Sequence, residues 1–297
     1  MGIASKISKF LPESFKPIAR KCYTPIARKI YYAPPIDFTS FFKRGGESQR
    51  LLPPTELMYV GGGDFEQIGK EILQTLIEIC GLKPTERVLD VGCGVGRVAI
   101  PLTSYLNYNG SYEGFDVVPK EIKWCQKKIS PRFPNFNFQL ADVYNKAYNP
   151  YAKDKASEYK FPYEDESFDF VFLTSVFTHI LTKDMENYLS EIVRVLRKGG
   201  RCSITYFLLN PETRTLMQQK RSRFDFSIKR DDGSYIVSKQ TPEGAVAYDE
   251  TYIRKLYQQN HLTLIEPVYF GSWRNGKDSL FFRKDSEFFQ DFILAAK

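Results

Sequence analysis

The sequence predicts an α/β protein built on a doubly wound, mostly parallel sheet. Apolar strand segments alternate with amphipathic helical segments between residues 64 and 209, and a glycine-rich turn follows the first strand. Two further strands near the C-terminus have no helix between them. Alternation of strands and helices is typical of parallel sheets with right-handed crossovers. We expect the last two strands to form an antiparallel pair at one edge of this sheet.

Three amphipathic helices are predicted from apolar residues at helical spacing. The first ends at Gly81, the second begins at Pro119, and the third runs from a Thr182 cap to Gly199-Gly200. Their apolar positions are Phe65, Ile68, Ile72, Leu76 and Cys80 in the first helix, Ile122, Cys125 and Ile129 in the second, and Met185, Leu189, Ile192, Val193 and Leu196 in the third. A further helical stretch follows the glycine-rich turn.

Short apolar segments are predicted as strands. They are residues 88–91, 112–115, 136–140, 168–173 and 202–209 in the alternating region, and residues 262–270 and 288–295 in the tail. Segment 168–173 has the apolar character of a strand that is covered on both faces. Two insertions interrupt the pattern. They are about 143–167, which holds five tyrosines, and about 210–248, which is polar and basic in its first half.

Residues 1–50 differ from residues 51–297, and we predict that they form a basic, helical N-terminal extension of the main domain. They hold ten Lys and Arg against three Asp and Glu, which equals the +7 net charge of the whole chain. The other 247 residues carry 32 charges of each sign. Prolines at 12, 17 and 25 limit the extension to two or three short helices.

Composition excludes several classes of protein. Hydrophobic residues at 42% and charged residues at 26% are typical of a globular domain. No apolar run approaches the roughly 18 residues of a membrane-spanning helix. Five scattered cysteines without a C-x-x-C pair argue for a reducing, cytoplasmic location and against disulfides or zinc. With only two histidines we expect no metal, and the neutral main domain argues against a nucleic-acid partner.

The glycine-rich turn carries the main functional signal. Its sequence is Asp90-Val91-Gly92-Cys93-Gly94-Val95-Gly96-Arg97. Glycines at such a turn let the backbone approach a ligand closely. Dinucleotide-binding enzymes need glycine where Arg97 stands, so the spacing here is G-x-G-x-G and not G-x-G-x-x-G.

This segment resembles motif I of the class I S-adenosylmethionine-dependent methyltransferases, and the resemblance extends over about residues 64–209 and the terminal strand pair. It implies a seven-stranded, Rossmann-like sheet with an antiparallel last strand. It also implies S-adenosylmethionine as the cofactor, with S-adenosylhomocysteine as its product. The cofactor-binding residues that it implies are Asp90, Gly92, Cys93, Gly94, Gly96 and Arg97 in motif I, Asp116 and Val117 after the second strand, Asp142 and Val143 after the third, and Thr174 and Ser175 after the fourth.

In this family the acidic residue matched by Asp116 binds the ribose hydroxyls, and the one matched by Asp142 contacts the adenine amino group. Ionised carboxylates at strand ends accept strong hydrogen bonds from a ribose diol. The alternatives are a helix N-cap before Pro119 for Asp116 and a turn residue for Asp142. Asp90 either contacts the ligand or holds the backbone amides of the loop.

The expected chemistry is methyl transfer, which needs chiefly proximity and alignment, with a base where the acceptor keeps its proton. His179, just past the fourth strand, is the candidate base, and a helix-start histidine bonded to the backbone is the alternative. His261 is expected to be structural. Five tyrosines either line an acceptor pocket or pack locally: Tyr144, Tyr148, Tyr151, Tyr159 and Tyr163. Weaker acceptor candidates are Tyr206, Asn210 and Trp273.

We therefore predict a methyltransferase that acts on a small-molecule, glycan-like or lipid-like acceptor, most plausibly at oxygen. One alternative is a partner subunit that binds the cofactor without catalysis. Another is an NAD-dependent dehydrogenase or epimerase, against which Arg97 and the terminal strand pair argue. Asn149-Pro150-Tyr151 resembles the N-P-P-Y box of nucleic-acid amino-methylating enzymes, but that box belongs directly after the fourth strand.

The basic extension has two possible roles. Its charge, with Ile3, Ile7, Phe10 and Leu11 at helical spacing, fits a helix lying on an anionic membrane surface through residues 1–31. Alternatively Ile18, Ile26, Ile30 and Tyr31 dock the extension over the acceptor cleft as a lid, with its charges solvated. The sequence does not indicate an oligomeric state.

Overall fold

A seven-stranded sheet forms the centre of the protein, in a computed structural model that describes residues 51–58, 63–146, 148–274 and 290–297. Its order is β10-β11-β5-β4-β1-β2-β3. The parallel strands are β1 (Arg87–Val91), β2 (Ser111–Asp116), β3 (Phe136–Leu140), β4 (Phe168–Leu173) and β5 (Leu196–Tyr206). Strand β11 (Asp291–Ala296) pairs antiparallel with β5, and β10 (Thr263–Tyr269) pairs antiparallel with β11 at the edge. The predicted fold class and terminal strand pair are confirmed, whereas the predicted helical extension lies outside the described residues.

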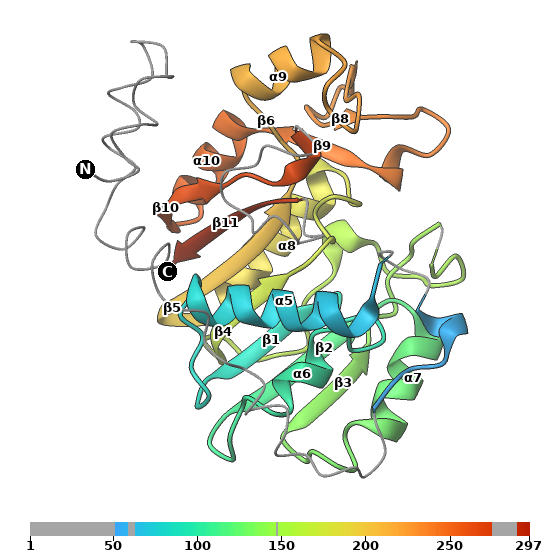
Figure 1. Cartoon of the computed structure of the whole chain (residues 1–297), viewed down its shortest axis with the longest axis vertical. Helices are drawn as coiled ribbons and strands as arrows, with labels where there is room; N and C mark the ends of the chain where they lie inside the picture. Colours follow the sequence, from blue (N-terminus) through green and yellow to red (C-terminus); the bar gives the residue numbers. More distant parts are fainter. Residues whose placement is uncertain (1–50, 59–62, 147, 275–289) are drawn as a thin grey trace, which may run out of the picture. The chain divides into compact units, whose positions relative to one another are not determined.

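Helices cover both faces of this sheet (Figure 1). On one face α5 (Phe65–Glu78), α6 (Ala99–Leu102) and α7 (Pro119–Lys128) pack against residues such as Val88 and Tyr112. On the other face α8 (Thr182–Val195) and α10 (Glu250–Gln259) pack against residues such as Leu89 and Phe115. Because side chains alternate along a strand, Val88 and Leu89 enter different layers of the core.

The order of the strands creates a switch point between β1 and β4. From β1 the chain continues outward to β2 and β3, whereas β4 and β5 build the sheet in the other direction. In open α/β sheets ligands bind at the carboxyl ends of the strands beside such a switch point. The fold therefore places the expected site at the ends of β1, β2 and β4.

Two predicted boundaries are wrong. Thr182 is the first residue of α8 and not its cap; the cap position is Leu181, and the Thr182 hydroxyl is buried without a hydrogen-bond partner. Gly199-Gly200 does not end the helix either, because α8 ends at Val195 and β5 begins at Leu196. A register shift in the β4–β5 pairing accommodates the two glycines, whose backbones bond to Lys297. Long-range pairing has extended the strand into a segment that local sequence assigns to a helix end.

Residues 207–249 form a smaller substructure beyond β5. It consists of α9 (Pro211–Gln218) and a four-stranded sheet in the order β6-β9-β8-β7. The strands are β6 (Leu208–Leu209), β7 (Ile228–Lys229), β8 (Tyr235–Ile236) and β9 (Val246–Asp249). The predicted fifth strand thus divides into β5 and β6, which belong to different sheets. Aromatic side chains of Phe207, Phe226 and Trp273 form its buried core.

Buried Asp291 joins this substructure to the main sheet. Its carboxylate accepts hydrogen bonds from the Leu208 amide (2.8 Å), the Trp273 indole (2.9 Å) and the Arg274 guanidinium (3.0 Å). Short 3-10 turns lie at η2 (Thr55–Leu57), η3 (Ala156–Glu158), η4 (Pro242–Gly244) and η5 (Ser272–Arg274). Within the described part of the chain, no helix combines the length and apolar character needed to cross a bilayer.

Candidate functional site

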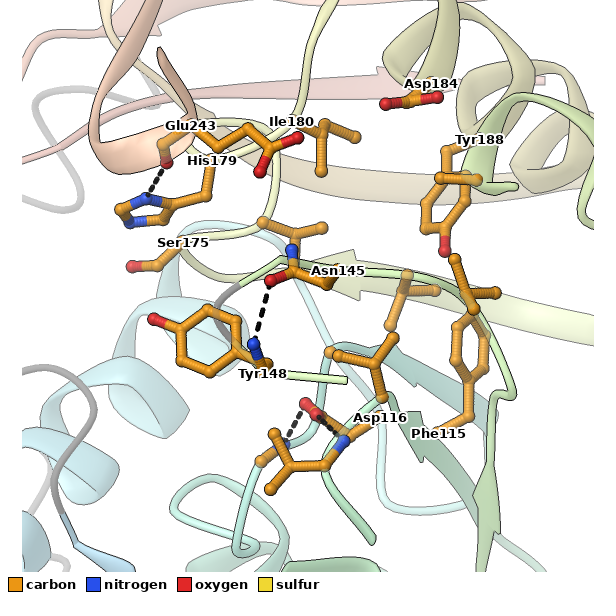
Figure 2. A pocket seen from close by; sticks show the side chains of 18 of the residues that line it. Phe115, Asp116, Asn145, Tyr148, Ser175, His179, Ile180, Asp184, Tyr188 and Glu243 are labelled. Atoms are coloured by element: carbon orange, nitrogen blue, oxygen red, sulfur yellow. Dashed lines mark hydrogen bonds between the residues drawn. The ribbon is translucent and has the colours of Figure 1, made fainter. Parts of the chain in front are cut away.

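A cavity lies at the carboxyl ends of β1, β2, β3 and β4, where the switch point predicts a ligand site (Figure 2). The empty space is about 970 Å³, which includes open solvent at the mouth. Its lining residues are Val91, Gly92, Gly94, Phe115, Asp116, Val117, Val118, Glu121, Val143, Tyr144, Asn145, Tyr148, Ala156, Thr174, Ser175, Val176, His179, Ile180, Asp184, Tyr188 and Glu243.

The glycine loop forms one wall of the cavity. Its backbone adopts conformations that favour glycine. Gly92, Gly94 and Gly96 have φ angles of 82°, 53° and 82°. A Cβ atom on Gly92 would lie 2.4 Å from Cγ2 of Val176 in the loop after β4. The loop therefore passes close to the β4 loop, and a side chain at Gly92 would occupy space at the cavity wall.

Asp116, at the end of β2, fastens the glycine loop to the second strand. Its Oδ2 accepts a hydrogen bond from the Gly94 amide at 2.8 Å, and its Oδ1 accepts one from the Val118 amide at 3.0 Å. Burial raises the pKa of this carboxyl above its usual range, while the backbone amide donors act in the opposite direction. A carboxylate has about four acceptor positions, so Asp116 can still accept hydrogen bonds from a ligand in the cavity.

The electrostatic character of the cavity is acidic. Asp116, Glu121, Asp184 and Glu243 line it, and no Lys or Arg does so among the described residues. Burial raises the pKa of Asp184, and the neighbouring Glu243 charge acts in the same direction. Such a lining favours a ligand with positive charge, and a sulfonium with an amino group has this character.

Asp90 is buried and does not line the cavity. It is 3% exposed, and its carboxyl accepts a hydrogen bond from the Tyr112 hydroxyl at 2.7 Å. Burial raises the pKa of Asp90 to about 8. The nearby Asp116 charge also raises this pKa, whereas the hydrogen bond from Tyr112 lowers it. Asp90 belongs with the core layer beneath α5 and α7, because Val88, two residues earlier, also packs there. The hydrogen bond from Tyr112 is not the loop-amide bond that the second interpretation expects, and a ligand contact of Asp90 stays a prediction.

The structure distributes the other residues of the predicted site unevenly. Val117, Val143, Thr174 and Ser175 line the cavity, whereas Cys93, Gly96, Arg97 and Asp142 do not. Cys93 and Gly96 are buried within the loop, and the Arg97 guanidinium lies 5.1 Å from the centre of the Phe65 ring. Asp142 is exposed, and its backbone carbonyl accepts a hydrogen bond from the Asp154 amide. An adenine contact of the Asp142 side chain remains a prediction.

His179 faces the cavity from the loop after β4. Its Nδ1 lies 3.0 Å from the backbone carbonyl oxygen of Glu243. Since a carbonyl oxygen only accepts, Nδ1 carries the proton in the neutral ring, and Nε2 keeps its lone pair. Burial lowers the pKa of His179 below its usual 6.5, so the ring is neutral at pH 7. The two interpretations of His179, a base and a histidine bonded to the backbone, are therefore compatible. The backbone hydrogen bond from Nδ1 sets the tautomer in which Nε2 can accept a proton.

Four of the five tyrosines of residues 143–167 form two groups, and the fifth, Tyr151, belongs to neither. Tyr144 and Tyr148 line the cavity and are 49% and 37% exposed, so they stand at its mouth. Tyr159 and Tyr163 instead pack against the ring of Phe115. Tyr151 is exposed and does not line the cavity.

The weaker acceptor candidates have structural roles instead. Tyr206 is buried and shares a hydrogen bond with Tyr257, Asn210 caps α9, and Trp273 donates to Asp291.

Several residues that line the cavity were not predicted from the sequence. Glu121 lies in the first turn of α7, Asp184 and Tyr188 lie on α8, and Glu243 lies in η4. Spacing from the predicted helix starts could have placed Glu121 and Asp184 near the carboxyl ends of the strands. No sequence signal points to Glu243, because its position depends on how the insertion folds back onto the β4 loop.

Comparisons with known proteins agree on the nature of this domain. A family model described as "Methyltransferase domain" matches residues 89–204. A phthiotriol/phenolphthiotriol dimycocerosates methyltransferase of Mycobacterium ulcerans is 35% identical over 126 residues, which are 42% of this chain and 38% of that protein. A sterol 24-C-methyltransferase of Schizosaccharomyces pombe is 32% identical over 120 residues, which are 40% of this chain and 27% of that protein. The chain thus spans well under two thirds of these relatives.

Solved structures share the fold at low sequence identity. A protein of Pyrococcus horikoshii has a TM-score of 0.50 and 16% identity, with coverage of 80% of this chain and 93% of that one. The cyclase SpnF also has a TM-score of 0.50 and 16% identity, and the match covers 80% of this chain and 83% of that one. Because SpnF is named for a cyclisation, the fold alone does not determine methyl transfer.

Proposed function

Because this chain belongs to the class I S-adenosylmethionine-dependent methyltransferase superfamily, we propose that it transfers a methyl group from S-adenosylmethionine to a hydroxyl oxygen of a lipid-like acceptor. The main support for cofactor binding is the position of Asp116. It lies at the end of β2, accepts a hydrogen bond from the Gly94 amide of the glycine loop and lines the cavity. Its free acceptor positions suit two ribose hydroxyls. The acidic lining suits the positive charges of the cofactor.

Apolar side chains of the cavity support the proposal that the acceptor is lipid-like. Val117, Val176 and Ile180 line it together with Phe115 and Ala156, and such a surface suits an apolar body better than a strongly hydrated sugar. The relatives named above are called methyltransferases of phthiotriol dimycocerosates and of a sterol, which are lipid-like molecules. The sterol enzyme is named for transfer to carbon, so the acceptor atom is the part of this proposal that rests on His179 alone.

The residues of the chain divide the work of this reaction. When bound, the cofactor would supply the methyl group from its sulfonium: the methyl C–S bond would break, and the sulfur would leave as the neutral thioether of S-adenosylhomocysteine. Asp116 and the glycine loop hold the ribose end, and the glycines leave room for close approach. Nε2 of His179 accepts the proton of the acceptor hydroxyl as the oxygen bonds to the methyl carbon. Alignment of the two reactants supplies most of the acceleration, up to about 7–11 kcal/mol.

Ligand-dependent thermal stability tests the cofactor half. At about a hundredfold excess over the dissociation constant, S-adenosylmethionine or S-adenosylhomocysteine should stabilise the fold by about 2.7 kcal/mol, and NAD should have no effect. Asp116→Ala should weaken binding by roughly 1.5–3 kcal/mol in calorimetry. A response to NAD alone would refute the proposal and favour the dehydrogenase alternative.

Transfer of a labelled methyl group tests the acceptor half. The acceptors are a sterol, a long-chain diol and a reducing sugar, supplied with cofactor labelled in its methyl group. We expect label in the lipid-like alcohols, and mass spectrometry of the product decides between oxygen and carbon. Cofactor binding without transfer to any of these three would instead support the non-catalytic partner subunit.

A further inference from the structure

A buried group of polar side chains lies beneath the loop that carries His179. It consists of Thr205 on β5, Gln290 directly before β11, and Thr178 within the loop, which are 3%, 6% and 0% exposed. The proposed function uses none of the three, and none lines the cavity. Buried polar side chains are retained where their hydrogen bonds fix a particular geometry.

Gln290 bonds to this loop at two points. Its Oε1 accepts a hydrogen bond from the Ser175 hydroxyl at 3.1 Å, and its Nε2 donates to the Thr178 hydroxyl at 3.4 Å. Both ends of one rigid amide are therefore engaged, three residues apart in the loop. The Ser175 amide is held separately, because it donates to Oγ1 of Thr205 at 2.8 Å.

Ser175 needs this support because its backbone is unusual. Its φ of 62° lies in the left-handed region, which a residue with a side chain occupies only when its surroundings impose it. The same residue lines the cavity, and Figure 2 shows its hydroxyl on the same side of the cavity as the His179 ring. Such conformations cluster at functional sites, where neighbouring contacts hold them in place.

The opposite side of the loop is held by the 210–248 insertion. The Val246 amide donates to the Thr178 carbonyl at 2.9 Å, and Nδ1 of His179 donates to the Glu243 carbonyl. These bonds hold the ring and the loop from the side of the insertion. Two side chains link the loop to the central sheet: Thr205 on β5, and Gln290 directly before β11, a strand paired with β5 along its whole length. Of the two, only Gln290 contacts the loop at two residues.

We propose that Gln290 is a positioning residue, which fixes the Ser175–His179 loop so that Nε2 of His179 faces the acceptor. This inference rests on the proposed function of His179, but the position of the ring is measurable without any acceptor. Loss of the amide should let the loop move and let water reach the ring. The titratable groups that share the cavity with His179 are Asp116, Glu121, Tyr144, Tyr148, Asp184, Tyr188 and Glu243.

NMR titration of His179 provides the test. The chain has only two histidines, so His261→Asn assigns both ring signals. In the unaltered protein we expect His179 to titrate below 6.5, since burial lowers its pKa. Gln290→Leu should shift this titration upward toward 6.5, and Thr178→Val, which removes one of the two bonds, should shift it less. Thr178→Val also serves as the readable variant if Gln290→Leu does not fold.

A matched control and an activity measurement complete the design. Gln126 on α7 donates one hydrogen bond to the Phe138 carbonyl on β3 and does not line the cavity, so Gln126→Leu should leave the titration unchanged. With an accepted substrate, Gln290→Leu should lower kcat by about 10- to 100-fold with nearly unchanged cofactor affinity. An unshifted His179 titration in both Gln290→Leu and Thr178→Val would overturn the inference. Failure of the unaltered protein to bind S-adenosylmethionine would overturn the proposed function instead.

Discussion

Asp90 on β1 and Asp116 on β2 lie near the ends of neighbouring strands, but they have different surroundings and different expected roles. Asp116 receives two backbone amide hydrogen bonds and lines the cavity, whereas Asp90 accepts a hydrogen bond from the Tyr112 hydroxyl and is buried. A carboxyl with few donors and no water is poorly stabilised when charged. The residue type alone therefore does not determine how well the charge of an acid is stabilised; the hydrogen-bond donors and the solvent around it do.

Replacement of His179 tests its role as a base. His179→Ala should lower kcat by about 10²–10⁴-fold and leave cofactor affinity nearly unchanged. In the unaltered enzyme kcat/KM should fall as pH decreases through the His179 pKa, which burial lowers below 6.5, because the protonated ring cannot accept a proton. His261→Asn is the control, because that exposed histidine has a φ of 58°, which asparagine tolerates. Activity of His179→Ala within about threefold of the unaltered enzyme would show that alignment alone suffices.

The raised pKa of Asp90 leads us to expect that the stability of the fold depends on pH. Burial raises its pKa from 3.8 to about 8 in the folded protein, so the folded state binds this proton more tightly than the unfolded state. The free energy of unfolding should therefore lose this contribution as pH rises from about 4 to about 8. Asp90→Asn removes the charge, and its melting temperature at pH 8.5 should exceed that of the unaltered protein. An unchanged slope of stability against pH in the variant would contradict this assignment.

Among the elements, the glycine loop and the loop after β4 constrain each other. The first bonds to β2 through Asp116, and the second bonds to β5 and β11 through Thr205 and Gln290. They approach each other where Gly92 faces Val176. Each loop is thus held by hydrogen bonds to residues on or next to strands other than its own, and these bonds fix two walls of the cavity.

Gly92→Ala tests two structural reasons for glycine at this position: the positive φ angle and the close approach of Val176. Its φ of 82° and the 2.4 Å approach to Val176 should together destabilise the fold by about 2–4 kcal/mol in urea unfolding and weaken cofactor binding. Adding Val176→Ala should relieve the clash but not the backbone strain. Gly81→Ala is a matched control, since φ is 64° there and nothing lies within 4 Å of an added Cβ. Equal effects of Gly81→Ala and Gly92→Ala would show that the close approach is unimportant.

At the scale of the whole molecule, charge is divided between two parts of the sequence. Residues 1–50 carry the net charge of +7, and the remaining 247 residues are neutral while their cavity is acidic. A neutral body gives an anionic surface little long-range attraction. Binding to such a surface would therefore depend on the extension, which lies outside the described residues.

Deletion of residues 1–35 distinguishes the two proposed roles of the extension. A lost lid should impair methyl transfer in free solution, whereas a lost membrane contact should leave it intact. Each basic residue near an anionic surface contributes about 1 kcal/mol, so the full chain should co-sediment with anionic vesicles at low salt and much less at high salt. Zwitterionic vesicles are the control. Absence of salt-sensitive sedimentation would exclude the membrane role.

Local sequence alone determined most of the fold. The strands β1 to β4, the helix from Phe65, the glycine loop and the antiparallel tail all follow from periodicity, apolar runs and backbone freedom, which act over a few residues. The position of Asp116 at a strand end follows for the same reason, since parallel strands bring their carboxyl ends to one edge.

Only the tertiary structure decided the details of the site. It turned Asp90 toward Tyr112, brought Glu243 to the ring of His179 from 64 residues away, and placed Gln290 beneath Ser175 from 115 residues away. It also divided the tyrosines of one insertion between the cavity mouth and the core. These contacts depend on which loops fold back onto the sheet edge. Hydrogen bonds between residues distant in sequence leave no periodic pattern, so they become visible only when the chain is folded.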